Sequence, residues 1–254
     1  MSHFYITLPS NASMDIYPQN TVAQYVTKLA DTVELDGSWE VGLVEIIYPH
    51  IWKNVRDNEA FLILNLLPTS EVINSEVTIA GGHYEDGYEL MRAINSSLRN
   101  IDIPTPIFSF DSSRKRAVVS MYDVPYSLTM SEHMKQVLGF TKVLKPGIEH
   151  TSDNEVNLDG GFSALYVYCN LLEQIHVGDT KAPLLRSIGV QGRYGDVIHQ
   201  MFDNPTYVPV QKKVFDTIEI DIMDDSGHTI PFEGGKSLVT LHFRRANDPY
   251  FLRR

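Results

Sequence analysis

The sequence predicts an all-β sandwich that is interrupted by two short inserted helices and by long loops. Two observations predict it: about ten short segments alternate apolar with polar residues, and turn-forming residues separate many of them. These segments are spread over the whole chain of 254 residues, which is long enough to bury one large β core or two small ones. No Gly/Ser-rich linker, repeat or low-complexity stretch divides the sequence, so we expect a single domain over residues 1–254.

The first two strands lie in the segment FYITLPSNASMDIYPQNTVAQYVTKL, residues 4–29. Phe4, Ile6 and Leu8 occupy alternate positions, and the alternation resumes near Tyr25. Nothing in this segment carries reactive chemistry. The polar residues between the two runs therefore form a strand connection.

The clearest strand patterns lie in SALYVYCNL, DTIEIDIM and SLVTLHF, in the second half of the chain. Their alternate apolar residues are Leu165, Val167, Cys169, Leu171, Ile218, Ile220, Ile222, Val239, Leu241 and Phe243. The sequence DDSGH predicts a turn in which Gly227 takes a positive φ. Further strands are predicted in WEVGLVEIIY, FLILNLL, EVTIA, IFSFD and AVVSMY, and the last two form a hairpin with its turn over residues 112–115.

Two segments have helical rather than strand spacing. In DGYELMRAINSSLRN, apolar residues recur at helical intervals and Asp86 is the expected N-cap. In LTMSEHMKQVLGF, Thr129 and Glu132 have the spacing of a capping box, and Gly139 ends the helix. We expect both helices to cover an edge or an end of the sandwich.

The longest irregular segments are residues 145–161 and 189–211, and loops of this length usually carry function or move. Of the two tryptophans that flank one predicted strand, Trp39 is expected in the core, whereas Trp52 fits either a core or an interface.

The charge balance disfavours nucleic-acid binding by the folded body. Lys and Arg number 21 against 32 for Asp and Glu, which gives a net charge of −11 that repels phosphate backbones. The single cysteine excludes internal disulfides and fits a reducing compartment. The N-terminus lacks a signal-peptide pattern, and no apolar run approaches the ~20 residues of a membrane helix, so a soluble intracellular protein is expected.

The sequence offers little catalytic chemistry. It has no Gly-x-Ser-x-Gly elbow, and Cys169 lies on the apolar face of a strand, where a structural thiol is expected. AGGHYEDG and EGGKS lack the spacing of phosphate-binding loops, and EGGKS is interpreted as a hairpin turn. EVNLDGG begins like a calcium loop, but Tyr166 stands where the closing Glu should be. The nine histidines do not fall at ligand spacing. We therefore expect no catalytic, cofactor-binding or metal site, and no enzymatic activity.

A family resemblance rests on an ordered set of segments. FYITLPSNASMDIYPQNTVAQYVTKL, WEVGLVEIIYPHIW, VLGF, LYVYCNL, VGDTKAPLLR and FDTIEIDIMDDSGHTIPFEGGKSLVTLHFRR occur in order from residue 4 to residue 245. Together they resemble the minor capsid, or penton, proteins of Maverick/Polinton elements and their adintovirus relatives. The resemblance implies a single jelly roll, an antiparallel sandwich of eight strands in two sheets.

The resemblance also implies partners and a location. Five copies would form the vertex of an icosahedral shell that packages double-stranded DNA, and a separate double jelly-roll protein would build the rest of the shell. It implies assembly inside a host cell, a place at the capsid vertex of the virion, maturation partners such as an adenovirus-like protease, and no membrane partner or sequence-specific nucleic acid. Residues 9–20 would then be either a loop at a subunit contact or an ordinary strand connection.

The C-terminal tail, residues 246–254, differs from the acidic body. The subunit-interface candidates at this end of the chain are Arg244, Arg245, Tyr250, Phe251, Arg253 and Arg254. Arginines beside aromatic residues suit a segment that docks on an acidic neighbour or makes a weak contact with packaged DNA. The alternative is a solubilising chain end.

Other classes remain open at the level of sequence. A carbohydrate- or receptor-binding module shares this architecture and would place aromatic residues over a shallow polar pocket. A hydrolase would gather carboxylates with perturbed pKa values in one pocket. A domesticated, transposon-derived host protein would have the same sequence pattern as the capsid protein.

Overall fold

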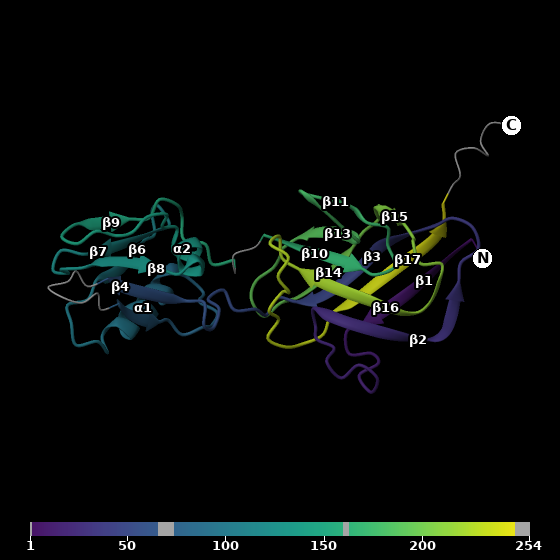
Figure 1. Ribbon diagram of the computed structural model, residues 1–254, viewed down its shortest axis with the longest axis horizontal. Coiled ribbons are helices and arrows are strands. Elements are labelled where there is room, and N and C mark those ends of the chain that lie inside the picture. The colour runs from purple at the N-terminus through teal and green to yellow at the C-terminus, as the bar shows by residue number, and fades with distance from the viewer. Residues whose placement is uncertain (1, 66–73, 160–162, 247–254) are drawn as a thin grey trace. The chain divides into compact units, whose positions relative to one another are not determined.

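The computed structural model describes residues 2–65, 74–159 and 163–246 (Figure 1). The chain forms two compact units, and each is described by itself. The first unit comprises residues 1–51 and 162–254, and the second unit comprises residues 52–161. The second unit is therefore an insertion in the sequence of the first.

Two antiparallel sheets make up most of the first unit (Figure 1). The strands of one sheet, in spatial order, are β1 (His3–Pro9), β17 (Leu238–Arg245), β3 (Trp39–Pro49) and β14 (Val197–Met201), with β15 (Tyr207–Pro209) also paired to β3. The strands of the other sheet are β13 (Leu184–Gly189), β10 (Ala164–Cys169), β16 (Val214–Met223) and β2 (Gln24–Glu34). A hairpin of β11 (Ile175–Val177) and β12 (Thr180–Ala182) lies between β10 and β13 in the sequence.

The strand pairing is nested. The outermost strands in the sequence, β1 and β17, pair with each other, and β2 pairs with β16. Further in, β3 pairs with β14, and β10 pairs with β13. This arrangement is the jelly roll, in which one long antiparallel ribbon folds over into two sheets. The predicted single jelly roll is confirmed, and its eight strands all belong to the first unit.

The core of the first unit lies between the two sheets. All ten alternate apolar residues predicted in the second half of the chain are buried. The Tyr25 hydroxyl of β2 donates to the Leu8 carbonyl of β1 at 3.2 Å, and the rings of Phe215 and Phe243 lie 5.9 Å apart. Both contacts join one sheet to the other, so the alternation marks the packed faces. Trp39 is buried as predicted.

The connections of the first unit are fixed by local hydrogen bonds. The Asn20 side chain bonds the carbonyls of Ala12 and Val26 and accepts from the Val26 N–H, which orders the loop between β1 and β2. Gly227 has the predicted positive φ, 79°. EGGKS is not a hairpin turn, because the strands before and after it, β16 and β17, belong to different sheets.

The second unit has its own strands and helices. Its sheets are β5 (Asn74–Thr78), β4 (Phe61–Asn65) and β8 (Ser127–Met130), and β6 (Ile107–Asp111), β7 (Arg116–Ser120) and β9 (Glu149–Thr151). Its helices are α1 (Gly87–Leu98) and α2 (Glu132–Leu138). The hairpin predicted with its turn over residues 112–115 is confirmed as β6 and β7.

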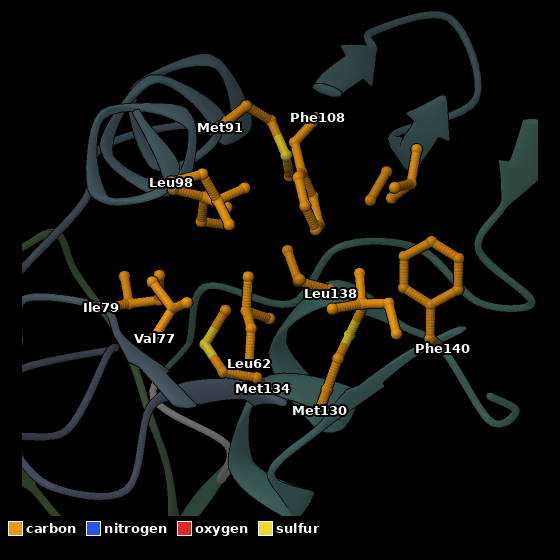
Figure 2. Close-up of a cluster of buried hydrophobic side chains, with 14 of the residues drawn as sticks. Leu62, Val77, Ile79, Met91, Leu98, Phe108, Met130, Met134, Leu138 and Phe140 are labelled. Atoms are coloured by element: carbon orange, nitrogen blue, oxygen red, sulfur yellow. The ribbon is translucent and has the colours of Figure 1, made fainter. Parts of the chain in front are cut away.

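Figure 2 shows the core of the second unit. Apolar side chains from both helices and both sheets meet there, among them Leu62, Val77, Met91, Leu98, Phe108, Met130, Met134, Leu138 and Phe140. Burial of a side chain of this size contributes about 1.5–3 kcal/mol. The helices are therefore part of a core of their own, not covers on the jelly roll.

The helix ends confirm two predictions and correct one. Asp86 caps α1 by accepting from the Glu89 N–H at 2.8 Å, and Gly139 ends α2 with a φ of 77°. The predicted capping role of Thr129 is wrong. Thr129 lies inside β8, where it pairs with Ile63, and Ser131 caps α2 by accepting from the Met134 N–H at 3.2 Å.

The sequence predicted a single domain, whereas the structure contains two compact units. Four predicted strands, at residues 61–67, 76–80, 107–111 and 117–122, fall in the second unit and not in the jelly roll. Both segments predicted as long loops contain strands, β9 in one and β14 with β15 in the other. That residues 1–254 form a single domain stays a prediction.

Candidate assembly surface

The cysteine is a core side chain. Cys169 is 1% exposed in β10, and burial raises the pKa of its thiol to about 12. A thiol in this setting stays protonated and unreactive at neutral pH. The expected structural role of Cys169 is therefore supported by its position.

Replacing Cys169 by alanine should lower the free energy of unfolding by about 1 kcal/mol, because a small cavity replaces the sulfur. Assembly should be unchanged. Chemical denaturation followed by a native mass measurement tests both statements. Fast labelling of native Cys169 by a thiol reagent would contradict its burial.

The segment that begins like a calcium loop is held by its own turn. The Asn157 side chain accepts from the Asp159 N–H at 2.8 Å, which uses one of the candidate ligand oxygens. Among residues 2–65, 74–159 and 163–246, no group of three or more His, Cys, Asp or Glu side chains is placed to hold a metal ion.

The outer face of the sheet of β1, β17 and β3 carries an aromatic row. The Tyr5 ring stacks on His242 at 4.4 Å, and the Tyr207 hydroxyl lies 2.7 Å from His242 Nδ1. The Arg244 guanidinium lies over the Tyr207 ring at 3.4 Å and pairs with Glu40. These contacts fix the side chains of a partly apolar surface, on which Tyr5 is 58% exposed.

Three polar side chains lie on the same face, toward β14. Glu45 accepts from the Thr240 hydroxyl at 2.8 Å, and its other oxygen lies 2.9 Å from His199 Nε2. The hydrogen bond from Thr240, followed by that from His199, lowers the pKa of Glu45. A carboxylate held in this way keeps its charge and limits which partner can lie on the face.

One open side of the jelly roll lies between the edge strands β13 and β14. Val197 and Met201 of β14 are 70% and 69% exposed, the highest fractions among the large hydrophobic side chains of the described residues. Beside them the Arg186 guanidinium covers the Phe202 ring at 3.8 Å and helps line a hollow of about 530 Å³. Edge strands with exposed apolar residues are typical places for a neighbouring chain to bind.

The opposite open side lies near β1 and β2 and holds an aromatic pocket of about 300 Å³. We define it by its lining residues, Phe4, Val33, Glu34, Leu35, Asp36, Trp39 and Arg245. The ring centroids of Phe4 and Trp39 lie 5.5 Å apart, and the Trp39 indole N–H donates to the Asp36 carbonyl at 2.9 Å. The pocket therefore has an apolar floor and a rim with two carboxylates and one guanidinium.

The structure places two of the predicted interface residues. Arg244 and Arg245 belong to β17 and pair with Glu40 and Trp39 of β3, so they are strand residues and not part of a tail. The Ala246 N–H still bonds the Ser38 carbonyl at 3.0 Å. Tyr250, Phe251, Arg253 and Arg254 lie outside the described residues. Sequence reasoning missed the aromatic row and the pocket, since both combine residues from distant strands.

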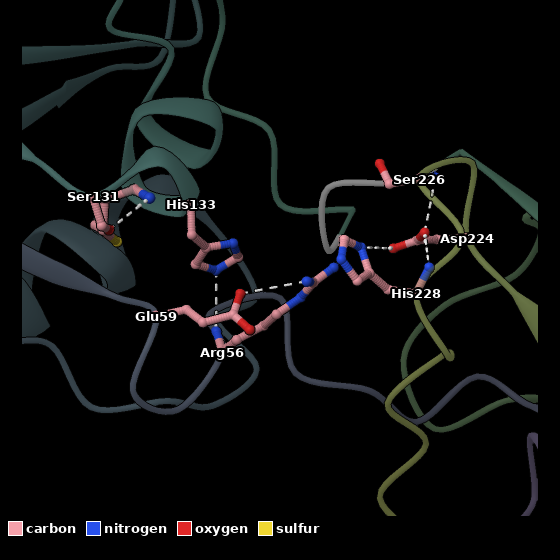
Figure 3. Close-up of polar contacts among 8 residues, drawn as sticks. Arg56, Glu59, Ser131, His133, Asp224, Ser226 and His228 are labelled. Atoms are coloured by element: carbon pink, nitrogen blue, oxygen red, sulfur yellow. Dashed lines mark hydrogen bonds and ion pairs between the residues drawn. The ribbon is translucent and has the colours of Figure 1, made fainter.

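Figure 3 shows polar side chains that stabilise loops in each unit. In the first unit, Asp224 is 4% exposed and accepts from the Ser226 and His228 N–H groups at 2.9 and 2.8 Å, which fixes the turn after β16. In the second unit, His133 Nε2 accepts from the Arg56 N–H at 3.1 Å. Both groups stabilise loops.

His133 should make the second unit less stable in acid. Burial, and then the nearby Arg56 guanidinium, lowers its pKa below the ordinary value of 6.5. The folded chain thus binds fewer protons at this site than the unfolded chain, so its stability contribution is present above pH 6.5 and is lost as the pH falls toward the lower pKa.

We expect the thermal midpoint reported by Trp52 fluorescence, in a Trp39→Phe background, to fall between pH 7.5 and 5.5. The variant His133→Gln should reduce this slope, because glutamine keeps an acceptor but does not titrate. His242 also has a lowered pKa and acts in the same direction. The slope of the variant is therefore compared with the slope of the chain that keeps His133, and it is not expected to reach zero. Equal slopes would contradict the role of His133.

No helix in the described part of the chain is both long and apolar enough to cross a membrane.

Comparisons with known proteins show likeness in fold. No protein-family model matches the sequence, and no curated protein matches it. Among solved structures, the mavirus penton protein is similar with a TM-score of 0.54 and 13% identity, covering 97% of this chain and 100% of that one. A chain in the structure of the Sputnik virophage matches with a TM-score of 0.49 and 12% identity, over 96% of this chain and 98% of that one. The chain thus has the fold of a penton protein.

Proposed function

We propose that this chain is a structural capsid protein of the penton type, which forms the fivefold vertices of an icosahedral particle. The observation that carries the proposal is the fold match to the mavirus penton protein, which spans 97% of this chain and all of the other. A match of this extent includes both the jelly roll and the residues inserted in it. The ordered sequence segments that resemble Maverick/Polinton and adintovirus pentons support the same function independently.

The proposed oligomeric state of this chain is a ring of five identical subunits. A ring requires heterologous contacts, in which two different surfaces of the subunit meet around a rotation axis. The jelly roll offers two such surfaces on opposite edges of its sheets. One, beside β13 and β14, exposes Val197 and Met201, and the other, beside β1 and β2, holds the aromatic pocket.

The remaining partners follow from the same proposal. A double jelly-roll major capsid protein would surround each ring and build the rest of the shell. The shell would hold double-stranded DNA, with which the basic tail makes at most a weak contact. Assembly would take place inside a host cell, and the mature protein would be a virion component.

Coassembly with a candidate double jelly-roll shell protein tests this function. We expect closed particles in which density for this chain occupies every fivefold vertex in electron cryo-microscopy. Particles that close with the vertices empty, in the presence of excess folded protein, would contradict the proposal. A variant with Val197→Ser and Met201→Ser, which changes only exposed residues of β14, should remain folded but stay out of the particles.

A further inference from the structure

The aromatic pocket beside β1 and β2 has the properties of a receptor for a peptide segment. Its volume of about 300 Å³ exceeds the roughly 150 Å³ that holds a benzene-sized ring in a protein interior. Phe4 and Trp39 supply an apolar floor onto which a ring can stack. Glu34 and Asp36 are exposed at the rim and add two negative charges against the single positive charge of Arg245. The pocket therefore suits an aromatic side chain next to a cation.

The C-terminal segment of this chain, residues 247–254, has that composition. It carries the aromatic residues Tyr250 and Phe251 followed by Arg253 and Arg254. The described chain ends beside the pocket, since Arg245 lines it and the Ala246 N–H bonds the Ser38 carbonyl. We propose that the aromatic pocket of one subunit binds residues 247–254 of a second copy. This inference rests on the proposed head-to-tail ring and names the contact that closes it.

A second copy is favoured over the same chain because a segment on one copy and a receptor on the next make two different surfaces, as the proposed ring requires.

Disulfide crosslinking tests the contact in the full chain. Two proteins are prepared in a Cys169→Ala background, one with Glu34→Cys in the rim and the other with Arg253→Cys in the segment, so that the disulfide replaces one proposed ion pair. We expect a disulfide-linked species that contains one copy of each protein, identified by its mass, when the two proteins are mixed and oxidised. The matched control is Asp225→Cys in place of Glu34→Cys. Asp225 is an exposed acidic residue that follows the end of β16, whereas Glu34 pairs with Val214 at the start of β16. The control should give at least tenfold less product.

Each other outcome overturns the inference in a defined way. A chain with both cysteines that closes only on itself, while the mixture gives no product, shows that the pocket binds the segment of its own chain. No product in either experiment shows that the pocket binds neither. If a ring of five forms but no crosslink does, the result contradicts this contact and leaves the proposed function intact. Crosslinked pairs without rings would leave this contact intact and contradict the proposed function.

Discussion

Truncation after Ala246 is expected to weaken subunit assembly by at least tenfold while leaving the thermal midpoint nearly unchanged. Strand β17 ends at Arg245 and Ala246 is the last described residue, so truncation after Ala246 leaves every described strand intact. Two aromatic rings that bury about 100 Å² of apolar area each would contribute of order 5 kcal/mol at ~25 cal/mol per Å², before the cost of ordering the segment. The loss should therefore appear in assembly and not in folding. Sedimentation and thermal unfolding measure the two effects on one sample.

Two variants separate the parts of this effect. Tyr250→Ala with Phe251→Ala removes the rings and keeps the charges, so assembly should weaken at all salt concentrations. Arg253→Gln with Arg254→Gln keeps the rings, so assembly should weaken mainly at low salt and lose its sensitivity to added salt. If the truncated chain assembles as well as the full chain across salt concentrations, the segment is only a solubilising end.

Replacing Phe243 by alanine is expected to destabilise the first unit by about 3–5 kcal/mol. Phe243 is fully buried in β17, stacks on Phe4 at 4.8 Å and lies 5.9 Å from Phe215 of the opposite sheet. Its loss removes contacts within one sheet and between the two sheets. Denaturant unfolding followed by Trp39 fluorescence, in a Trp52→Phe background, measures the change.

The control for this variant is Tyr122→Ala, because Tyr122 is 62% exposed and its replacement should change stability by no more than about 0.5 kcal/mol. Trp52 in a Trp39→Phe background then reports the second unit in the Phe243→Ala chain. If the two units unfold as one cooperative unit, both reporters should shift together. A shift of Trp39 alone would show that the two units unfold separately, and no shift at all would contradict the core role of Phe243.

Strand positions were predictable where one face of a strand is buried. Ile218, Ile220 and Ile222 alternate with polar residues in β16, and all three are fully buried. Strand β14 was missed because Ile198 is its one buried residue, while Val197 and Met201 face outward. An edge strand with apolar residues on its exposed face has no amphipathic alternation. The exposed apolar residues that concealed the strand are the ones that now mark a candidate contact surface.

The division into two units was not predictable from local patterns. Alternation shows that residues 61–65 form a strand, but the choice of partner strand depends on contacts far away in the sequence. The helix cap illustrates the same limit. Thr129 and Glu132 fit a capping box, but pairing of β8 with β4 extends through Met130, so the helix cannot begin before Ser131.

The docking role of the arginines and aromatic residues at the C-terminal end stays a prediction. The acidic, aromatic pocket was not predictable from the sequence. Phe4, Glu34, Trp39 and Arg245 lie on four different strands or strand ends, and only the nested pairing of the jelly roll brings them together.

The central claim is that this chain builds a closed ring of five through two different surfaces. Native mass spectrometry of the purified protein, alone and with its shell protein, tests it most directly. We predict a species of five chains whose abundance falls on truncation after Ala246. A mass that corresponds only to a monomer or a twofold dimer, with no five-chain species in the presence of the shell protein, would contradict the claim.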